Sequence, residues 1–422
     1  MRKMKDSGIE WIGQIPEDWA IIRLKRIAKI QTGNTPSKTV NSKYYCESGL
    51  MWVKPENLHS FKTIDSTKEY LNNDAKIIAR VAPPCTPLVC CIGTIGKIGY
   101  SLFEVGYNQQ INAISFKESL YSWKFGMYYL SSVEEQHWFY ANGNVVQIIN
   151  TENQGKILFS LPSIDEQIEI TAFLDRKCTK IDETIEMEKQ VIEKLKAYKQ
   201  SVIREAVTKG LEPNVPIKES GIEWIGNIPE HWKAIKLKYE FKIKKNIAGK
   251  VGYDILSVTQ KGIKIKDISN NEGQISMNYS KYQLVDVNDY VMNHMDLLTG
   301  FVDCSKYVGV TSPDYRVFSL INKKNSKEYF KYIFQCCYTN KIFYGLGQGV
   351  SGLGRWRLQT DKFLNFSLPI PQICEQDKIA TYLNNKCFNI DNAISQKENL
   401  IEKLAQYKKS LIYECVTGKQ EV

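Results

Sequence analysis

The sequence has little of what metal or redox chemistry requires. Only four His are present, at positions 59, 137, 231 and 294, and no two of them are close together in the chain. The 11 Cys stand singly or as adjacent pairs and never as C-x-x-C. This spacing predicts reduced, mostly buried thiols, and no zinc site or disulfide framework.

Membrane and secretion signals are also missing. No apolar run approaches the roughly 18–20 residues of a membrane-spanning helix. The first residues, MRKMKDSGIEW, lack the apolar core of a signal peptide. We therefore expect a cytoplasmic protein.

Motifs of common enzymes are absent as well. The sequence contains no G-x-x-x-x-G-K-[ST] loop, no G-x-S-x-G and no H-E-x-x-H. Its only Pro-Pro pair, APPC at 82–85, does not fit the motif of amino-methyltransferases. We expect a protein that is not an enzyme and that itself binds neither a cofactor nor a metal.

What the chain does contain is an internal duplication. The phrase SGIEWIGQIPEDW at 7–19 returns 213 positions later as SGIEWIGNIPEHW, and residues 161–210 match residues 370–419 at an offset of 209. Residues 23–160 and 236–369 show no convincing match beyond their first few residues. Each half is thus a shared frame around an unshared insert.

Positive charge is concentrated in the inserts. The chain carries a net charge of +10; residues 23–164 hold 15 Lys and Arg against 10 Asp and Glu, and residues 236–369 hold 20 against 11. The repeated tracts are nearly neutral, with 9 against 10 over 165–210 and 7 against 6 over 374–419. A basic surplus on two modules favours a polyanion such as DNA, although a surplus that only aids solubility is the alternative.

The repeated tracts predict long helices with a coiled-coil seam. Residues 165–207 contain no Pro, and apolar residues recur in both tracts in steps of three, four and seven. A helix of some 40 residues is roughly 60 Å long and needs a partner of similar length to cover its apolar stripe. We expect the two copies to pair antiparallel about a pseudo-twofold axis. The predicted seam residues are Leu174, Ile181, Ile185, Ile192 and Leu195 in one helix and Leu383, Ile390, Ile394, Ile401 and Leu404 in the other.

The predicted fold class is α+β, with two mixed α/β modules separated by the two long helices. We expect strands over 49–55, 87–103 and 111–116 and a helix over 123–139 in the first insert, and strands over 253–258, 281–292 and 315–321 and a helix over 327–343 in the second. The predicted parts are a repeat segment packing on the scaffold (1–22), module one (23–160), a long helix (161–210), a linker with the second repeat segment (211–235), module two (236–369) and the C-terminal helix (370–422).

Polar loops of the inserts supply the candidate DNA contacts. Asn and Gln can pair with adenine, and Arg or Lys with guanine or phosphate. The candidates in the first insert are Thr35, Ser37, Lys38, Lys54, Asn57, Lys97, Asn108, Gln109 and Gln110. Those in the second are Lys244, Lys245, Asn246, Gln260, Lys261, Asn293, Gln348, Ser351, Arg355 and Arg357. For any single residue, a solvated loop without a ligand is the alternative.

Together these features resemble the specificity subunit of Type I restriction-modification systems. The resemblance lies in the doubled SGIEWIG phrase, the LP-x-x-x-EQ tract at Leu161 and its IP-x-x-x-EQ counterpart at Ile370, the helix ends EAVTKG and ECVTGK, and the insert phrases GNTPS, MWVKPENL and GTIGKIGY. It implies that each insert reads one half of a split, asymmetric double-stranded DNA site and that the helices set the spacer.

The resemblance also implies partners. These are two modification subunits, which carry S-adenosylmethionine and the adenine methyltransferase site, and often two restriction subunits driven by ATP with Mg²⁺. Two other classes stay open on the residues alone. One is a coiled-coil adaptor that holds two protein-binding domains apart, and the other is a nuclease or methyltransferase of unfamiliar type.

Overall fold

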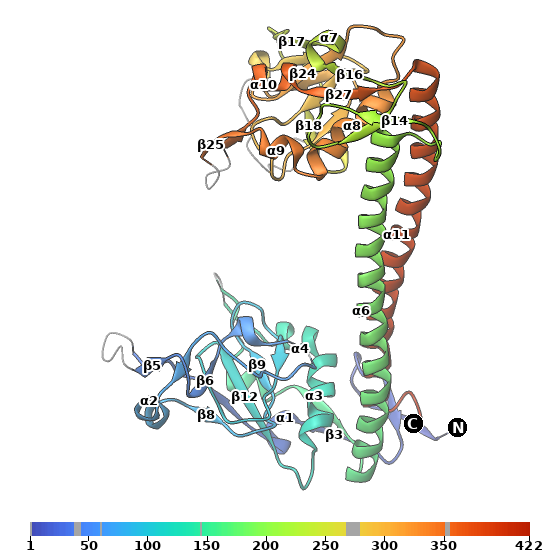
Figure 1. Cartoon of the computed structure of the whole chain (residues 1–422). Helices are drawn as coiled ribbons and strands as arrows, with labels where there is room; N and C mark the ends of the chain where they lie inside the picture. The colour runs from blue at the N-terminus through green and yellow to red at the C-terminus, as the bar shows by residue number, and fades with distance from the viewer. Residues whose placement is uncertain (1, 38–43, 60, 144–145, 267–278, 351–354) are drawn as a thin grey trace. The chain divides into compact units, whose positions relative to one another are not determined.

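The computed structural model describes residues 2–37, 44–59, 61–143, 146–266, 279–350 and 355–422. The chain divides into two compact units (Figure 1). Unit 1 comprises residues 1–188 with 399–422, and unit 2 comprises residues 189–398. Both units contain part of each of the two long helices.

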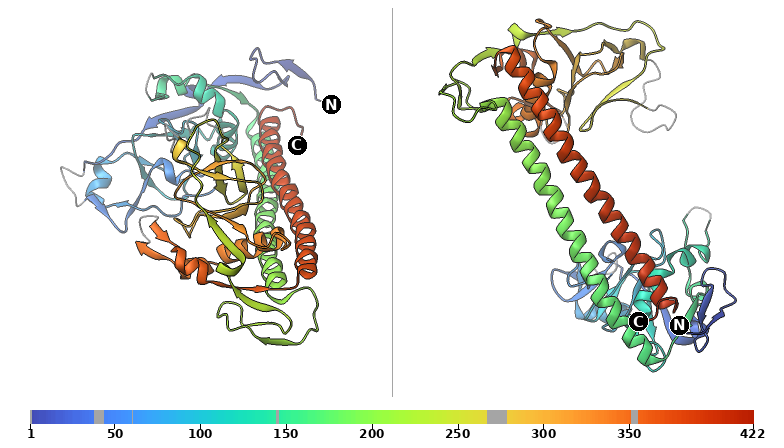
Figure 2. Two further views of the ribbon diagram at one scale, coloured as in Figure 1. Left: turned by 90° about the horizontal axis from the view of Figure 1, so that it is seen from above. Right: turned by 90° about the vertical axis from the view of Figure 1, so that its right-hand side faces the viewer.

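The long helices are α6 (Ile164–Lys209) and α11 (Ile373–Val416), and they run antiparallel within each unit. In unit 1 the hydroxyl of Ser160, just before α6, donates to the carbonyl of Val416 at 2.5 Å. Further along, Lys408 pairs with Asp182 at 2.7 Å. In unit 2 Lys199 pairs with Asp391 at 2.6 Å. The two views of Figure 2 show the ends of the helices side by side at each module.

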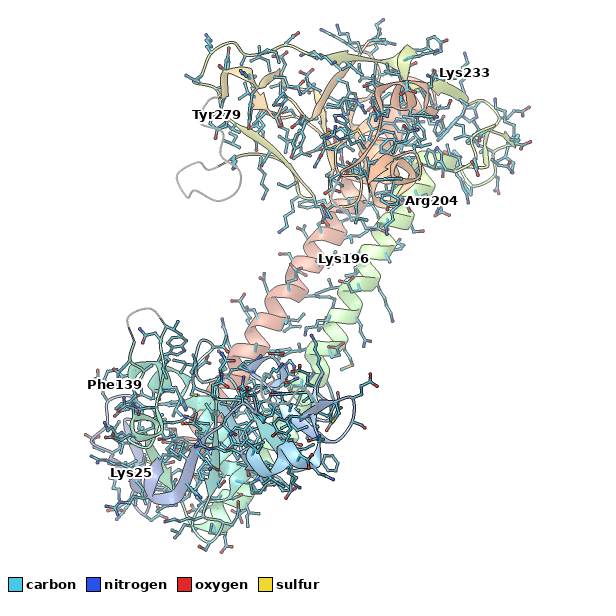
Figure 3. All side chains as sticks on the ribbon, turned by 90° about the vertical axis from the view of Figure 1, so that its left-hand side faces the viewer. Lys25, Phe139, Lys196, Arg204, Lys233 and Tyr279 are labelled. Atoms are coloured by element: carbon cyan, nitrogen blue, oxygen red, sulfur yellow. The ribbon has the colours of Figure 1, made fainter. Side chains whose placement is uncertain are left out.

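Burial along both helices follows the spacing of the predicted seam. Leu174, Ile181, Ile192, Leu383 and Ile390 are buried, and Ile185, Leu195, Ile394, Ile401 and Leu404 are half-buried. Between them the helices present charged residues to solvent, and Figure 3 shows Lys196 and Arg204 projecting from α6. A narrow apolar stripe with polar flanks is the surface of a two-stranded coiled coil.

The two interhelical ion pairs are copies of one another. Asp391 lies 209 positions after Asp182, and Lys408 lies 209 positions after Lys199, so the duplication repeats the pair in each unit. Both aspartates are more than half exposed, which limits the strength of the pairs.

We predict that each pair contributes little to stability. A double-mutant cycle with Lys199→Gln and Asp391→Asn, followed by urea unfolding of the intact chain, should give a coupling energy of about 0.2–1 kcal/mol. The same cycle on Asp182 and Lys408 should agree with it within that range. A coupling of several kcal/mol in either cycle would contradict the view that the apolar seam holds the helices together.

Unit 1 contains a four-stranded antiparallel sheet with the order β10-β9-β12-β4 and a five-stranded sheet with the order β5-β7-β6-β11-β8. Its strands are β1 (Met4–Asp6), β2 (Gln14–Pro16), β3 (Ala20–Arg23), β4 (Ala28–Thr32), β5 (Tyr45–Cys46), β6 (Leu50–Val53), β7 (Tyr70–Leu71), β8 (Val81–Ala82), β9 (Leu88–Cys90), β10 (Ile98–Gly99), β11 (Val105–Tyr107), β12 (Ile111–Phe116) and β13 (Leu158–Leu161). Its shorter helices are α1 (Leu24–Ile27), α2 (Asn73–Ile78), α3 (Trp123–Ser132), α4 (Glu134–Phe139), α5 (Thr151–Gln154) and a 3-10 turn at Pro55–Asn57.

Unit 2 contains a four-stranded antiparallel sheet with the order β17-β24-β21-β22 and several two-stranded pairs. Its strands are β14 (Ile217–Glu219), β15 (Asn227–Pro229), β16 (Lys233–Lys236), β17 (Phe241–Lys244), β18 (Leu256–Thr259), β19 (Gly262–Ile265), β20 (Gln283–Val285), β21 (Tyr290–Met292), β22 (Val302–Cys304), β23 (Gly309–Thr311), β24 (Arg316–Leu320), β25 (Gln348–Val350), β26 (Arg355–Arg357) and β27 (Ser367–Ile370). Its shorter helices are α7 (Leu237–Glu240), α8 (Lys327–Thr339), α9 (Ile342–Gly345), α10 (Thr360–Asn365) and a 3-10 turn at Tyr279–Lys281.

The two inserts share a central sheet that their sequences do not reveal. In unit 1, β4 follows the four-residue helix α1 and pairs with β12, which pairs in turn with β9 of the β9–β10 hairpin. In unit 2, β17 follows the four-residue helix α7 and pairs with β24, which pairs in turn with β21 of the β21–β22 hairpin. Ala28 lies opposite Phe116 at one end of this pairing, and Phe241 lies opposite Leu320 at the equivalent end. The duplication therefore extends into the inserts as a fold, although the side chains have diverged.

Both helices predicted near the ends of the modules are interrupted. The helix expected over 123–139 breaks at Val133, where the hydroxyls of Ser131 and Ser132 bond back to carbonyls three residues earlier. The helix expected over 327–343 breaks at Lys341, which has a left-handed φ of 58°. Side-chain bonds to the backbone compete with helix continuation at such positions.

The main apolar cores lie where the modules meet the long helices. In unit 1 residues of α3 and β13 pack with Leu174 and Cys178 of α6 and with Leu411 and Cys415 of α11. In unit 2 residues of α8 and β27 pack with the last turns of α6 and the first turns of α11. All 11 Cys are free and eight of them are buried. The structure confirms the predicted α+β class with paired long helices.

Candidate nucleic-acid interface

Two polar loops that are distant in the sequence come together in unit 1. The loop after β4 packs against the loop after β11, since the amide of Asn34 donates to the carbonyl of Tyr107 at 3.2 Å. A Cβ atom on Gly33 would lie 2.2 Å from the carbonyl oxygen of Asn108, so only glycine permits this approach. The predicted candidates Thr35, Asn108 and the two neighbouring glutamines thereby form one cluster.

Within this cluster some side chains shape the loop and others face solvent. Asn108 is buried; it donates to the side chain of Gln110 at 3.0 Å and accepts from the Gln110 amide at 3.1 Å. Gln109, Thr35 and Ser37 are exposed, and the Thr35 hydroxyl donates to the Gln109 side chain. These side chains lie at the surface of the module, whereas Asn108 fixes the backbone that presents them.

Arg80 joins this cluster and was not among the residues predicted from the sequence. Its guanidinium donates to the carbonyl of Thr32, and its amide donates to the Asn34 side chain at 2.7 Å. The side chain is exposed and adds a positive charge beside the polar loops. Arg80 lies between α2 and β8, and no motif in the sequence marks it as a candidate. It reaches Thr32 and Asn34 only because the fold brings these segments together.

A second group of candidates surrounds the turn at Pro55–Asn57. Lys54 forms an ion pair with Glu69, and Asn57 accepts from the Lys54 amide at 2.9 Å. The ammonium group of Lys97 donates to the carbonyl of Pro55 at 3.0 Å. These three side chains stabilise the turn next to β6, and the charge of Lys54 is already balanced.

In unit 2 two of the predicted candidates are engaged inside the module. Lys244 lies 2.6 Å from both Asp286 and Asp289. Burial lowers the pKa of Lys244, but the hydrogen bonds to the two aspartates outweigh it and the net shift is upward. Asn293 accepts from the amide of Met295 at 3.2 Å and closes a turn.

The remaining unit 2 candidates are mostly at the surface. Lys245, Asn246, Gln260, Lys261, Gln348 and Arg357 are exposed. Lys261 stands in the turn between β18 and β19, and Gln348 lies opposite Arg357 in the β25–β26 hairpin. Lys38 and Ser351 lie outside the described residues, and Arg355 is described only by its backbone as part of β26.

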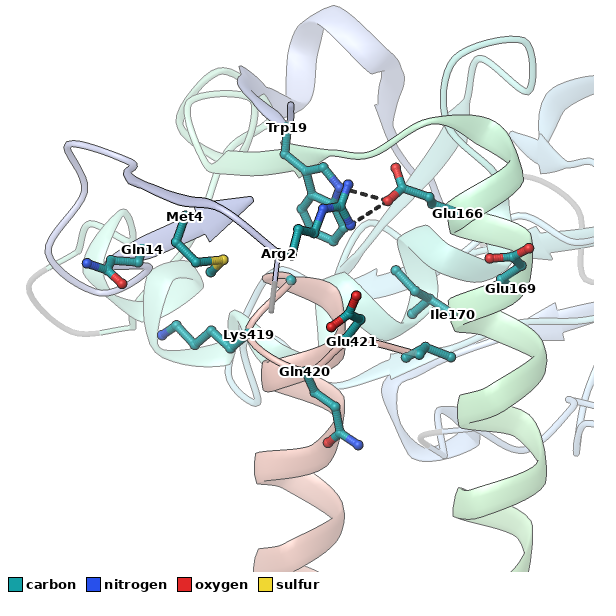
Figure 4. Close-up of a pocket in the computed structure, with 12 residues that line it drawn as sticks. Arg2, Met4, Gln14, Trp19, Glu166, Glu169, Ile170, Lys419, Gln420 and Glu421 are labelled. Atoms are coloured by element: carbon teal, nitrogen blue, oxygen red, sulfur yellow. Dashed lines mark hydrogen bonds and ion pairs between the residues drawn. The ribbon is translucent and has the colours of Figure 1, made fainter. Parts of the chain in front are cut away.

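The first copy of the repeated phrase forms a clamp on the helix ends in unit 1. The Trp19 indole N–H donates to Glu166 in the first turn of α6 at 3.3 Å, and Arg2 bridges Asp18 at 2.5 Å and Glu166 at 2.6 Å. Figure 4 shows Trp19 and Arg2 turned toward Glu166 at the edge of a cavity of about 890 Å³, whose wall includes the end of the chain after α11. The hydroxyl of Tyr413 in α11 donates to the carbonyl of Trp11 at 2.6 Å, so the phrase contacts both helices.

The second copy builds the same clamp with different charges. The Trp232 indole N–H donates to Glu375 of α11 at 3.0 Å, and His231 lies 2.9 Å from the same carboxylate. The position 213 residues after Arg2 is Val215, so no arginine stands at the equivalent position. His231, which stands where the first copy has Asp18, takes the place of the arginine as a side-chain partner of Glu375.

The clamp in unit 1 predicts an acid-sensitive contribution to stability. Burial raises the pKa of Glu166, but hydrogen bonds from Arg2, Trp19 and Ser163 lower it by more than burial raises it. The pKa of Glu166 therefore lies below its ordinary value of 4.5. A carboxylate whose pKa is lower in the folded state than in the unfolded state stabilises the protein at any pH above its unfolded-state pKa. This stabilisation is lost as the pH falls through the folded-state pKa.

We therefore expect the Tm of the intact chain to fall between about pH 5 and pH 3, and Glu166→Gln to flatten part of this fall while lowering the Tm at pH 7. Glu169→Gln, at an exposed position on the same cavity, is the matched control. An unchanged pH dependence in Glu166→Gln would show that the carboxylate does not act in this way.

Comparison with known proteins identifies the class to which this architecture belongs. Residues 16–197 match the family model of the Type I restriction modification DNA specificity domain. The chain is 24% identical over 431 residues to the Type I restriction enzyme MjaVIII specificity subunit of Methanocaldococcus jannaschii, an alignment that covers 97% of this chain and 94% of that one. It is 23% identical over 192 residues to the MjaIX specificity subunit of the same organism, which covers 44% and 43%.

Solved structures agree in fold. A chain from work on complex assembly and conformational transition of the type I R-M system superposes with a TM-score of 0.71 at 13% identity, covering 96% of this chain and 99% of that one. The HsdS subunit from Thermoanaerobacter tengcongensis superposes with a TM-score of 0.51 at 13% identity, covering 96% and 98%.

The family model thus covers the first insert with its flanking frame, and the relatives extend the similarity to nearly the whole chain. Over nearly its whole length the chain is similar to DNA specificity subunits of Type I restriction-modification systems, the resemblance that its sequence predicted. Among the described residues, no helix is long and apolar enough to cross a membrane. No group of three or more His, Cys, Asp or Glu in the described ranges is arranged to hold a metal ion.

Proposed function

We propose that the chain reads a bipartite, asymmetric DNA target, with one half-site read by each module. The observation that carries this proposal is the combination of one central sheet, present in both units, with loops that differ in sequence and in polar side chains. A shared scaffold with divergent loops is suited to two related tasks with different specificities. The basic surplus of both inserts supports DNA as the ligand.

Side chains on each module would then divide into two roles. Exposed cations such as Arg80, Lys245 and Lys261 would position the module on phosphates, while amides such as Gln109 and Gln348 would read base edges. The buried or paired candidates, such as Asn108 and Lys244, would act by fixing the loops that carry these groups.

The same proposal assigns catalysis to partners. Two adenine-methyltransferase subunits would dock on the repeated frame, and restriction subunits could join them, so that the complex works in the cytoplasm on the cell's DNA. S-adenosylmethionine, ATP and Mg²⁺ would be bound by those partners and not by this chain. The twofold repetition of the Trp–Glu clamp offers two equivalent positions on the frame, which supports a pair of identical partners.

Equilibrium binding of the intact chain to double-stranded DNA tests this function. Each neutralised phosphate contributes about −0.9 to the slope of log K against log salt concentration. We expect a slope of several units and no turnover when S-adenosylmethionine or Mg²⁺ is added without partner subunits. A coiled-coil adaptor for proteins would bind duplex weakly with little salt dependence, and methylation or cleavage by the purified chain would reveal an enzyme.

A further inference from the structure

A small pocket in unit 2 contains a buried positive charge. The cavity of about 260 Å³ lies between the end of β17, the start of β24 and the start of α10. Its lining includes Lys245, His294, Arg316 and Thr360. All of these residues belong to unit 2, so the pocket is complete within one module.

Arg316 is the unusual member of this lining. It is only 4% exposed. One end of its guanidinium donates to the carbonyl of Leu358 at 2.9 Å and reaches the Thr360 hydroxyl at 3.4 Å, and the group stacks over the ring of Phe363 at 4.6 Å. These contacts hold the guanidinium in one orientation.

The other end of the guanidinium is unused. Nη1 of Arg316 is buried and has no hydrogen-bond partner among the residues that the structure describes. Burial lowers the pKa of Arg316 to about 10, so the group is still charged at neutral pH. A buried charged donor without a partner is costly and calls for an explanation.

His294 places a second unpartnered atom in the same lining. Its Nδ1 is buried and makes no hydrogen bond within the described part of the chain. Burial, and then the charges of Arg316 and Arg357, lower the pKa of His294 to about 4. The ring is therefore neutral at pH 7, and in one tautomer its Nδ1 carries a hydrogen that has no acceptor among the described residues.

The equivalent position in unit 1 is closed by its own side chains. Counting back from the paired ends of the two sheets, Asn112 in β12 corresponds to Arg316 in β24. Asn112 donates to Gln154 at 2.7 Å and accepts from Thr32 at 2.7 Å. Phe363 lies 209 positions after Gln154, the offset of the repeated frame. An uncharged amide pair, in which only Nε2 of Gln154 has no partner among the described residues, is thus replaced in the other module by a stacked guanidinium with a buried, unpartnered Nη1.

We propose that this pocket is an oxyanion site that takes a phosphate group, with Nη1 of Arg316 as its charged donor. His294 supplies a neutral donor, and the exposed Lys245 supplies positive charge beside the opening. Guanidinium groups form strong charge-assisted hydrogen bonds with phosphate oxygens, and the low dielectric of the pocket strengthens them. The phosphate could be that of a bound duplex, a form that rests on the proposed function, or free phosphate, which does not.

The first arm of the test uses inorganic phosphate and the intact chain. With the four His labelled and His294 assigned by a His294→Gln variant, NMR titration should show the pKa of His294 rising in phosphate relative to chloride at equal ionic strength. The Tm should rise in phosphate as well. Arg316→Met, which keeps a side chain over Phe363, should abolish both effects, whereas the exposed control Lys261→Met should keep them.

Two results would overturn the proposal. One is a His294 pKa in the unaltered chain that is the same in phosphate and chloride. The other is a full phosphate response in a folded Arg316→Met variant. If Arg316→Met does not fold, Lys245→Met takes its place, and it should weaken the response severalfold; an undiminished response would then count against the site.

The second arm separates the two sources of phosphate. A series of duplexes is made in which each member replaces one backbone phosphate with an uncharged methylphosphonate. The intact chain should bind one member of the series more weakly than the others, and Arg316→Met should not distinguish that member from the rest. Uniform binding of all such duplexes, with the response to free phosphate intact, identifies the site as one for the free anion. Failure of the chain to bind duplex at all would refute the proposed function and leave the phosphate response to decide this inference alone.

Discussion

Exchange of residues 236–369 for an insert of different sequence should change one half of the methylated DNA sequence and leave the other half unaltered. The insert is attached to the frame through β16 and β27, which pair from Lys233 opposite Ile370 to Lys236 opposite Ser367. The frame on either side of the exchange is one of two copies related by the internal duplication. The module should therefore be replaceable without disturbing the clamp or the seam.

The expected effect of this exchange is large. Each mismatched base pair costs about 1–3 kcal/mol of binding free energy, so a half-site with several altered bases should lose methylation by several orders of magnitude. The readout is sequencing of methylated adenines in cells that supply the methyltransferase subunits. The matched control exchanges residues 23–160 instead, and it should change the opposite half. A change in both halves after a single exchange would contradict one reader per module.

Removal of the Trp232 side chain should destabilise unit 2 more than any other single truncation of the frame. Trp232 is fully buried, contacts Gly210 at the end of α6 and donates to Glu375 at the start of α11. Truncation of a buried aromatic residue to alanine costs about 3–5 kcal/mol, and here it also removes the hydrogen bond. Calorimetry of Trp232→Ala should show a lower transition for this unit.

Two further variants separate packing from hydrogen bonding in this clamp. Trp232→Phe keeps most of the apolar contact and loses the bond to the carboxylate, so we expect a loss of about 1.5–3 kcal/mol. Trp138→Ala removes an indole that is 44% exposed, and it should change stability by about 0.5 kcal/mol or less. Equal losses in Trp232→Ala and Trp138→Ala would show that the repeated phrase does not hold the helices.

The frame was predictable because its signals are local or repeated. The seam was predicted from the spacing of apolar residues within each long helix, from Leu174 in the first and from Leu383 in the second. The antiparallel pairing was predicted from the duplication. The shared sheet of the inserts was not predictable, because its equivalences, such as Asn112 with Arg316, are defined by strand register and not by residue identity. The helix break at Val133 accompanies weak side-chain bonds of Ser131 and Ser132, and the break at Lys341 is a left-handed backbone conformation. Neither leaves a strong mark in the sequence.

Candidate contacts were harder to predict than the frame. Thr35 and Gln109 were predicted as DNA contacts because they lie in polar loops of the first insert, and the fold brings their side chains together. The same criterion selected Lys244, whose charge two aspartates balance, and it overlooked Arg80 and Arg316, whose surroundings arise only from tertiary packing. Residue type indicates what a side chain can bind, whereas the fold determines whether it is free to do so.

The central claim is that two unlike modules on one repeated frame read two unlike half-sites. Sequencing of methylated adenines in a host that carries this chain with its methyltransferase subunits tests it most directly. We predict a single motif in two parts, with different bases in each part and an unread spacer between them. A continuous motif, a palindrome with identical halves, or methylation without sequence preference would contradict the claim.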